Sequence, residues 1–277
     1  MTELIENKLI DFNLINRKLK ICAIGGGEIA IKDNKISDGL ILIKYALKQF
    51  SLKENSKVLI IPTAKSSQKQ YNQMIESTYQ AWQNLGLKID LLHQYNKMPA
   101  VKKLKEKIER ADCFYITGGD TLQMMTIWRK YKIDKLLSQS ANKGKAILGV
   151  SAGAIAPMIW GHSDSMSYKV EAGHAWDYIK VEGLGLLPLA ITPHYDTKMP
   201  PKNKPRAKEF KKMYLTQAKS KPHNIITGFG INNFAAIIVQ NGKLDFASTR
   251  PTAHIHKLFI RGGQVATQTM PNKLLYN

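Results

Sequence analysis

The sequence predicts an α/β protein built on a mainly parallel, doubly wound sheet that is flanked by helices. Two observations support this class. Short apolar segments alternate along the chain with longer segments that carry apolar residues at helical spacing, and several of the apolar segments end in glycines. Both are typical of strands in an open parallel sheet with helices on its two faces. At 277 residues the chain is long enough to bury a large core without disulfides or metal, so we expect one domain over 1–277.

In the first half of the chain the alternation is regular. We expect strands at 19–27, 57–64, 88–93, 113–120 and 146–150, and helices at 37–50, 68–85, 100–111 and from 121 to about 142. Residues 1–18 precede this pattern, and we interpret them as an N-terminal extension of the domain.

The second half adds strands of a different kind. A strand at 186–192 and a basic helix at 204–218 are followed by strand-like runs at 234–240, 243–248 and 255–260. Asn241-Gly242 separates two of these runs and is a strong hairpin signal. We therefore expect antiparallel strands at an edge of the sheet near the C-terminus.

The net charge of +20 raises the question of a nucleic-acid partner. Only six of the 41 basic residues are arginine, and the lysines are spread along helices, with one dense patch at 201–221. Because phosphate and base recognition favour the guanidinium fork, a lysine-coated helical face in water explains the patch better. We expect no specific nucleic-acid partner.

Location follows from what the sequence lacks. No run approaches eighteen apolar residues, and the opening MTELIENKLIDFN has acids among its apolar residues, unlike a secretory signal. We expect a cytoplasmic protein with no membrane association.

The sequence shows no pattern for a metal or cofactor. Cys22 and Cys113 lie in apolar stretches typical of buried thiols, and no Cys/His group has zinc-ligand spacing. Gly25-Gly26-Gly27 lacks the spacing of a dinucleotide-binding loop. We expect no metal and no cofactor.

The strongest catalytic signal is Gly149-Val150-Ser151-Ala152-Gly153, a G-x-S-x-G sequence between a predicted strand and helix. In this setting a sharp turn exposes the serine hydroxyl, and small neighbours let strand and helix approach each other. Ser151 is therefore the candidate nucleophile. The alternative is a structural turn whose serine caps the helix.

A serine nucleophile needs a base, and His194 is the best placed of the seven histidines. It follows the strand at 186–192, so it lies on the same rim as Ser151 if that strand is parallel. His162 is close to Ser151 in sequence, which should place it at the end of the following helix and away from the site. Gly118-Gly119-Asp120 also ends a strand, and its glycines leave N–H groups free for a ligand or an oxyanion, while Asp120 caps the next helix.

Together these segments resemble peptidase family S51, which includes α-aspartyl dipeptidase and cyanophycinase and has a fold akin to class I glutamine amidotransferases. The matching segments are YITGGDT at 115–121, GVSAGA at 149–154, GHSDS at 161–165 and GLGLLPLAITPHYD at 183–196. The resemblance implies a serine peptidase with Ser151 as nucleophile and His194 as base. It also implies oxyanion donors at Gly119 and Ala152, and substrate contacts at Gly118, Asp120 and Thr121.

The third triad member departs from the family pattern. Members commonly have an acid in the segment that corresponds here to 230–233, and this chain has Asn232 and Asn233. We take Asp164, in GHSDS, as the first candidate to orient His194. The two asparagines and Asp196 remain open as alternatives, and an asparagine would stabilise the imidazolium less than a carboxylate does.

The resemblance implies a small peptide substrate, above all a dipeptide with an N-terminal aspartyl residue. A pocket cation would attract it, and Arg250 and Lys169 are candidates. The alternatives are a cyanophycinase-type hydrolase and a catalytically impaired binding protein that kept the fold. We expect a monomer or a homodimer.

Overall fold

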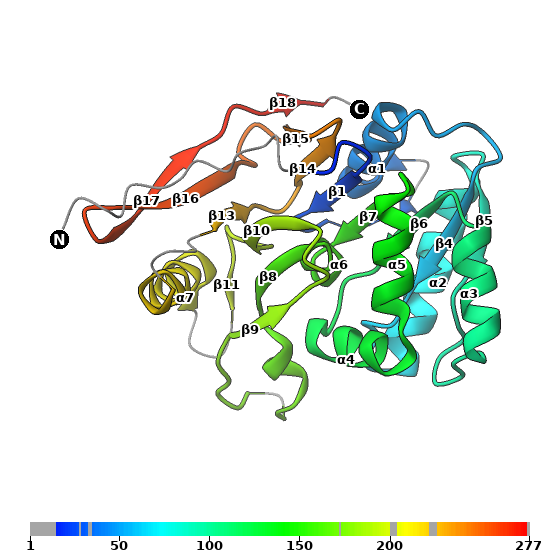
Figure 1. Cartoon of the computed structure of the whole chain (residues 1–277), viewed down its shortest axis with the longest axis horizontal. Coiled ribbons are helices and arrows are strands. Elements are labelled where there is room, and N and C mark those ends of the chain that lie inside the picture. Colours follow the sequence, from blue (N-terminus) through cyan, green and yellow to red (C-terminus); the bar gives the residue numbers. More distant parts are fainter. Residues whose placement is uncertain are drawn as a thin grey trace.

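The computed structural model describes residues 15–27, 29–32, 35–171, 173–199, 204–221 and 226–275. Its larger sheet has eight strands (Figure 1). Their order is β18 (Lys273–Leu274), β15 (Lys243–Ser248), β14 (Ala235–Gln240), β1 (Lys20–Ile24), β7 (Ala146–Val150), β6 (Cys113–Ile116), β4 (Lys57–Ile61) and β5 (Lys88–Leu91). Strands β1, β7, β6, β4 and β5 run parallel to one another. Strand β14 is antiparallel to β1, and β15 is antiparallel to β14.

A second sheet of six strands lies beside the first. Its order is β17 (Gln264–Thr269), β16 (Ile255–Arg261), β13 (Thr227–Ile231), β10 (Leu187–Thr192), β8 (Met158–Ser163) and β9 (Ile179–Glu182). The central strands β13, β10 and β8 are parallel. At the edges, β16 is antiparallel to β13, β17 is antiparallel to β16, and β9 is antiparallel to β8. Two short hairpins complete the strands: β2 (Ile31–Lys32) with β3 (Lys35–Ile36), and β11 (Lys198–Met199) with β12 (Lys204–Pro205).

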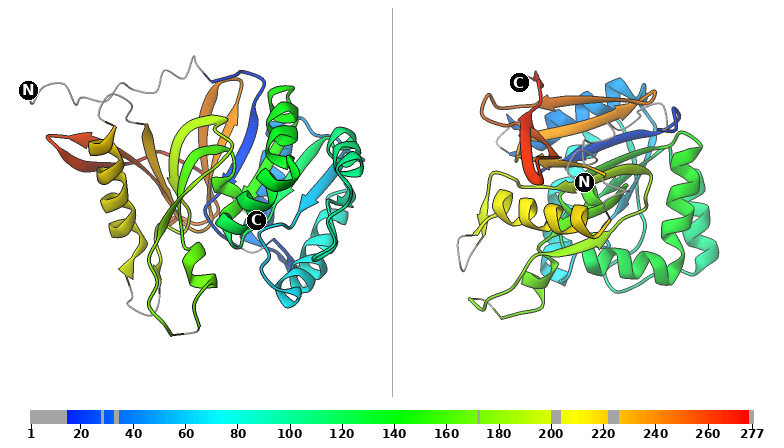
Figure 2. Two further views of the ribbon diagram at one scale, coloured as in Figure 1. Left: turned by 60° about the horizontal axis from the view of Figure 1, so that its bottom comes forward. Right: turned by 60° about the vertical axis from the view of Figure 1, so that its left-hand side comes forward.

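The helices divide among three apolar cores. Helices α1 (Asp38–Gln49) and α2 (Gln68–Gln83) cover one face of the larger sheet. On the other face, α3 (Val101–Arg110), α4 (Thr121–Tyr131) and α5 (Ile133–Asn142) share a core with the second sheet. Helix α7 (Arg206–Ser220) covers the outer face of the second sheet, as Figure 2 shows.

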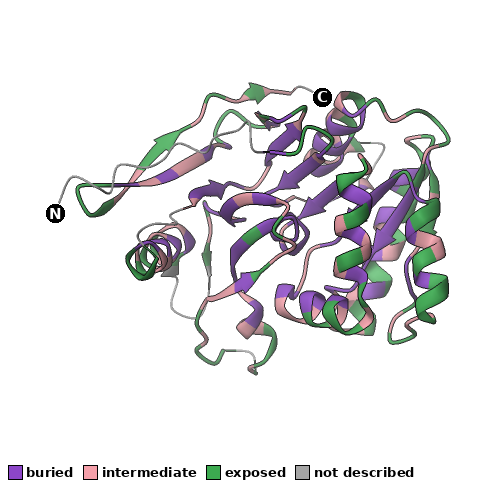
Figure 3. Ribbon diagram, viewed as in Figure 1, coloured by how far each residue is buried: buried purple, intermediate pink, exposed green. Residues whose placement is uncertain are grey.

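Strand β1 shows how the sequence builds these layers. Its side chains alternate between faces, so Cys22 and Ile24 pack with α1 and α2, whereas Ile21 and Ala23 pack in the opposite core. All four are buried, and the central strands in Figure 3 are correspondingly purple. A strand buried on both faces reads as a continuous apolar run, and KICAI is one.

The predicted class is confirmed: the structure has a mostly parallel central sheet flanked by helices, with antiparallel strands near the C-terminus. Two expectations were wrong in detail. Strand β10, which precedes His194, belongs to the second sheet and does not share a sheet with β7. The expected helix at 121–142 is two helices, since Lys132 adopts a left-handed conformation with φ 60°.

Other differences follow from short elements. The helix after Ser151, α6, covers only Ala152–Ile155, so the chain returns at once as β8 and His162 lies on a strand. A short 3-10 helix, η2 (Ser165–Tyr168), follows β8. Most of the predicted extension at 1–18 lies outside the described residues, as do residues 201–203 of the basic patch.

The basic helix predicted near 204–218 is amphipathic, as expected. Lys208, Lys212 and Lys219 of α7 are exposed, whereas Phe210 and Tyr214 are buried against the second sheet. Within the described residues, no helix is both long enough and apolar enough to span a bilayer.

Candidate active site

Three residues are held at the carboxyl end of β1 by successive backbone carbonyls. The carbonyl of Ile24 accepts from Ser151 N at 3.0 Å, that of Gly25 from His194 N at 3.1 Å, and that of Gly26 from Phe234 N at 2.8 Å. Ser151 follows β7, His194 follows β10, and Phe234 lies between β13 and β14. The end of β1 therefore joins segments from both sheets.

All three held residues have positive φ: 54° at Ser151, 52° at His194 and 64° at Phe234. Such conformations are unfavourable for residues with a Cβ, and they persist where surrounding structure enforces them. Here the hydrogen bonds to β1 contribute to that enforcement.

The turn at Ser151 depends on the glycines around it. A Cβ at Gly149 would overlap the carbonyl oxygen of Gly153, and a Cβ at Gly153 would overlap that of Ile116. Strand, turn and α6 can therefore pack this closely only with glycine at both positions. This is the elbow that the sequence pattern predicts, although α6 is a single turn.

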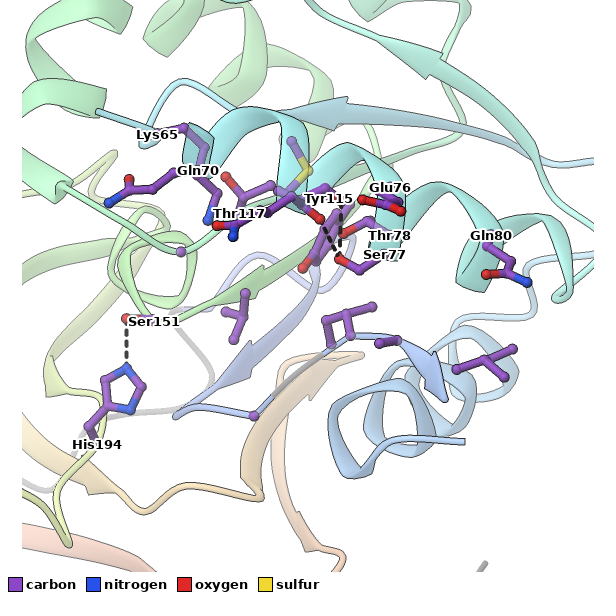
Figure 4. A pocket seen from close by; sticks show the side chains of 18 residues that line it. Lys65, Gln70, Glu76, Ser77, Thr78, Gln80, Tyr115, Thr117, Ser151 and His194 are labelled. Atoms are coloured by element: carbon purple, nitrogen blue, oxygen red, sulfur yellow. Dashed lines mark hydrogen bonds between the residues drawn. The ribbon is translucent and has the colours of Figure 1, made fainter. Parts of the chain in front are cut away.

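The Ser151 hydroxyl is directed to His194 rather than to the helix. Ser151 Oγ and His194 Nε2 are 2.9 Å apart, and the serine side chain makes no capping hydrogen bond to α6 (Figure 4). This distance lets a hydroxyl proton pass to the imidazole. The structure thus brings the two residues together, although they follow strands of different sheets.

The second ring nitrogen of His194 contacts Asn233. Its Nδ1 lies 2.7 Å from Asn233 Oδ1. The Asp196 carboxylate in turn accepts two hydrogen bonds through Oδ1, from Asn233 N at 2.9 Å and from Asn233 Nδ2 at 3.0 Å. The four side chains form one chain of contacts, Asp196–Asn233–His194–Ser151.

This chain determines the position of the imidazole proton. An ionised carboxylate only accepts, so the amide nitrogen of Asn233 faces Asp196 and its oxygen faces His194. An amide oxygen also only accepts, so His194 Nδ1 carries the proton. Nε2 is then left with a lone pair that accepts from the Ser151 hydroxyl.

The surroundings keep His194 neutral. Burial is the largest influence and lowers its pKa below the usual value, and the charge of Arg206 lowers it further. The hydrogen bond that His194 donates to Asn233 and the charges of Asp164 and Asp196 raise the pKa but do not reverse the shift. A neutral imidazole is the form that can act as a base.

Gly26 has a role that the sequence analysis did not assign. A Cβ at this position would overlap Asn233 Oδ1 and the His194 ring at Nδ1 and Cε1. The lack of a side chain thus lets β1 lie against the hydrogen bond between His194 and Asn233. The signal for this role in the sequence is the run of three glycines at the end of a predicted strand.

Asp164 does not take the orienting position that we expected for it. Its carboxylate pairs with Arg206, whose Nη1 lies 2.9 Å from Oδ2. Arg206 is 1% exposed and also donates to the carbonyl of His162 at 3.2 Å and to Thr192 Oγ1 at 3.2 Å. Asp164 therefore acts on His194 only through its charge, because Asn233 occupies the position at Nδ1.

Asn232, the other asparagine considered, faces elsewhere. Its N–H donates to the carbonyl of His254 at 3.1 Å, which ties β13 to the loop before β16. Its buried Oδ1 has no hydrogen-bond partner among the described residues.

The Gly118-Gly119 turn lies against Ser151. A Cβ at Gly118 would be 3.2 Å from Ser151 Cβ and 3.9 Å from Ser151 Oγ. Gly119 has φ 142° and packs on the carbonyl of Ala64, which accepts from Asp120 N at 2.8 Å. The backbone of this turn is thus close to the hydroxyl, as an oxyanion site requires.

Asp120 and Thr121 are turned into the protein. Asp120 is fully buried, caps α4 by accepting from Gln123 N at 3.0 Å, and pairs with Lys169 at 3.1 Å. Thr121 Oγ1 accepts from Ser163 Oγ at 3.0 Å. Of the three predicted substrate contacts, only Gly118 lines the cavity beside Ser151.

A cavity of about 810 Å³ opens beside Ser151 and His194 (Figure 4). One wall is the face of α2 that carries Gln70, Gln73 and Ser77, and another is the segment 29–31. The two cations proposed for the pocket are elsewhere: Arg250 pairs with Asp38 at 2.8 Å, and Lys169 with Asp120. Lys65 lines the cavity instead.

Metal chemistry has no evident site here. Among the described residues, no group of three or more His, Cys, Asp or Glu side chains is placed to hold an ion. Cys22 and Cys113 are buried thiols, and burial raises the pKa of each to about 12.

Comparisons with known proteins find similarity to peptidases. The model of peptidase family S51 matches residues 22–247. An uncharacterised peptidase of Bacillus subtilis, YgaJ, is 26% identical over 257 residues, which cover 92% of this chain and 99% of the relative. Peptidase E of a Nostoc species is 23% identical over 172 residues, or 61% of this chain and 65% of the relative.

Two solved structures share the fold. A peptidase from an acI-B1 actinobacterium superposes with a TM-score of 0.64 at 16% identity and covers 91% of this chain and 94% of its own. A putative peptidase E from Listeria monocytogenes gives a TM-score of 0.54 at 20% identity, with 84% and 99% covered.

The first prediction concerns Gly26. Gly26→Ala places a methyl group where His194 and Asn233 touch, so one of them must move. We expect the rate of Ser151 phosphonylation by a fluorophosphonate probe to fall about 100-fold, the cost of misplacing a reacting group by about 1 Å. Unfolding in urea serves as the control for folding. A folded variant that reacts at the wild-type rate would contradict the role assigned to this glycine.

The second prediction concerns the His194 pKa. In Asn233→Asp a carboxylate replaces the amide at Nδ1 and favours the imidazolium, so the pKa should rise. Since the base works only when neutral, the acidic limb of the labelling rate should move to higher pH. NMR titration of the histidine ring protons measures the shift, and His93, at the end of β5, is the internal control. An unchanged or lowered His194 pKa would contradict the arrangement.

Proposed function

The chain belongs to peptidase family S51, and on that premise we propose that it is a serine peptidase that cleaves small peptides through Ser151 and His194. The contact between Ser151 Oγ and His194 Nε2 at 2.9 Å carries the proposal. The strained elbow, the ordered tautomer of His194 and the adjacent cavity are the further features that a serine nucleophile needs.

The first half of the reaction forms an acyl-enzyme. His194 Nε2 takes the Ser151 proton as Oγ attacks the peptide carbonyl, and the carbonyl oxygen becomes an oxyanion. We assign the oxyanion to the backbone N–H groups of Gly119 and Ala152, since the turn at Gly118 lies against Ser151. The protonated Nε2 then gives its proton to the leaving amine as the C–N bond breaks.

The second half of the reaction hydrolyses the acyl-enzyme and regenerates the free enzyme. Water enters, Nε2 removes its proton, and the hydroxide attacks the ester carbon at Ser151. When the tetrahedral intermediate collapses, Ser151 Oγ leaves and regains its proton from His194 Nε2. The amino-terminal residue of the substrate departs as a free acid.

Asn233 and Asp196 act on His194 without contacting the substrate. The imidazolium formed during attack keeps its Nδ1–H on Asn233 Oδ1. The Asp196 carboxylate lies beyond Asn233 and does not touch the ring. It accepts hydrogen bonds from the backbone N–H and the side-chain amide of Asn233, and so polarises that amide. We regard both as positioning residues. The presence of the Asp196 carboxylate in this series of contacts argues against an inactive protein that merely kept the fold.

The finer substrate assignment comes from the family. Two similar proteins are named as peptidase E, one of them as putative. We assign this chain a preference for dipeptides with an N-terminal aspartyl residue, and the net charge of +20 would steer such anions toward the cavity.

The third prediction tests the proposal itself. Wild-type protein should react with a fluorophosphonate probe at a single serine, identified by peptide mass spectrometry as Ser151, and should hydrolyse aspartyl dipeptides. Ser151→Ala should lose the label and reduce kcat by about 10⁴-fold or more. The matched control is Ser140→Ala, on α5 and outside the site. Folded wild-type protein that takes no label would exclude a serine hydrolase.

The fourth prediction separates positioning from substrate binding. Asp196→Ala frees the Asn233 amide to rotate, so part of the His194 population loses the proton at Nδ1. We expect kcat to fall about 10- to 100-fold with little change in KM, less than the about 10⁴-fold loss for a directly bonded triad acid. Asp196→Glu should recover part of kcat. A rise in KM at constant kcat would show that Asp196 binds substrate instead.

A further inference from the structure

The cavity beside Ser151 is lined by a cation that has no counter-ion among the described residues. Among the described residues that line it, Lys65 is the only lysine or arginine, and Glu76, which is exposed, is the only acid. In the described part of the chain no carboxylate or carbonyl takes up the Lys65 ammonium. Burial lowers its pKa, and no acid in the described ranges offsets that effect.

Three other buried or partly buried cations of this protein are paired. Arg206 pairs with Asp164, Lys107 with Asp90, and Lys145 donates to the carbonyls of Ile108 and Glu109 at 3.0 and 2.7 Å. A half-buried ammonium without a partner loses hydration that nothing in the protein replaces. Lys65 therefore has an unmet demand for an anion.

A second polar group of the same cavity is also unpartnered. Thr117, at the end of β6, is 1% exposed, and its hydroxyl has no hydrogen-bond partner among the described residues. Figure 4 shows Lys65 and Thr117 on the side of the cavity opposite His194. Buried hydroxyls are normally satisfied, so this one indicates a missing acceptor.

The loop that carries Lys65 is fixed in place. Lys65 N donates to the Pro62 carbonyl at 3.0 Å, and Gln123 Nε2 donates to the Lys65 carbonyl at 3.0 Å. The preceding residue, Ala64, packs against Gly119 beside the elbow. The lysine backbone is thus ordered before any ligand binds, which reduces the entropy lost on binding.

We propose that Lys65 and Thr117 form a subsite that binds a carboxylate of the substrate. The ammonium would supply the charge, and the Thr117 hydroxyl would donate a hydrogen bond. The inference rests on the proposed function and assigns the pocket cation to a residue outside the family motifs. The carboxylate comes from one of two places: the side chain of an acidic N-terminal residue, or the free C-terminus of a dipeptide.

Two substrate pairs test the subsite and identify the carboxylate. The first pair is the p-nitroanilides of aspartate and asparagine, which have no free C-terminus and differ only in the side-chain charge. The second pair is Ala-Leu and Ala-Leu-amide, which differ only at the C-terminus. For each pair, the preference is the kcat/KM of the substrate with the carboxylate divided by the kcat/KM of its uncharged partner. In Lys65→Met we expect this ratio to fall about 10- to 100-fold for one pair, as for loss of a hydrogen bond to a charged group. The ratio that falls names the source.

The variants include matched controls. Lys69→Met removes an exposed lysine from the start of α2 and should leave both ratios at the wild-type value. Lys65→Arg should retain part of the preference, and Thr117→Val should lower the same ratio by a smaller factor. Calorimetric binding of Asp-Leu and Asn-Leu to the Ser151→Ala protein provides the side-chain comparison without turnover.

The outcomes are separable from those of the proposed function. Wild-type protein that labels at Ser151 but keeps both ratios in Lys65→Met would overturn the subsite alone. An equal fall for every substrate would also overturn it, because Lys65 would then act on the reaction itself. Failure of Ser151 to label would instead overturn the peptidase proposal.

Discussion

The arrangement of the site depends on the carboxyl end of one strand. Successive carbonyls of Ile24, Gly25 and Gly26 hold the N–H groups of three residues with positive φ, which come from three different segments of the chain. Two of these residues are Ser151 and His194. Because the strain of each turn is balanced by hydrogen bonds to the same short backbone stretch, the hydroxyl and the imidazole are fixed relative to each other. The absence of a side chain at Gly26 then leaves room for the ring and for Asn233 beside it.

The second constraint is electrostatic. The protein orients His194 with the amide of Asn233. The Asp196 carboxylate fixes that amide and does not itself contact the imidazole ring. Only one orientation of the Asn233 amide lets it donate to Asp196, and that orientation presents the amide oxygen to His194. The amide nevertheless stabilises the imidazolium less than a carboxylate in direct contact would. Arg206 adds to this by lowering the His194 pKa, and its pairing with Asp164 limits the effect. The site is thus built to keep the base neutral, and the Lys65 ammonium is a charge left available for a ligand.

Much of this was predictable from local sequence. The buried runs and the G-x-S-x-G sequence predict the sheet and the elbow, and the position of His194 after a strand predicts a place at the site. The second sheet was missed because α6 is a single turn, and nothing in 149–163 distinguishes a short helix from a longer one. Asp164 lies in a motif that points to the site, yet Arg206, 42 residues later in the chain, takes its carboxylate. Asn233 and Asp196 are 37 residues apart, so their pairing depends on how β10 and β13 lie side by side. Local pattern carries no information on such contacts.

The central claim is that Asp196 and Asn233 fix the proton of His194 on Nδ1 and leave Nε2 free to accept from Ser151. A long-range ¹H–¹⁵N correlation spectrum of the folded protein near neutral pH tests it directly, because protonated and unprotonated ring nitrogens have different shifts. The account predicts that His194 Nδ1 has the shift of a protonated nitrogen and Nε2 that of an unprotonated one. A spectrum in which Nε2 carries the proton, with Nδ1 bare, would contradict it.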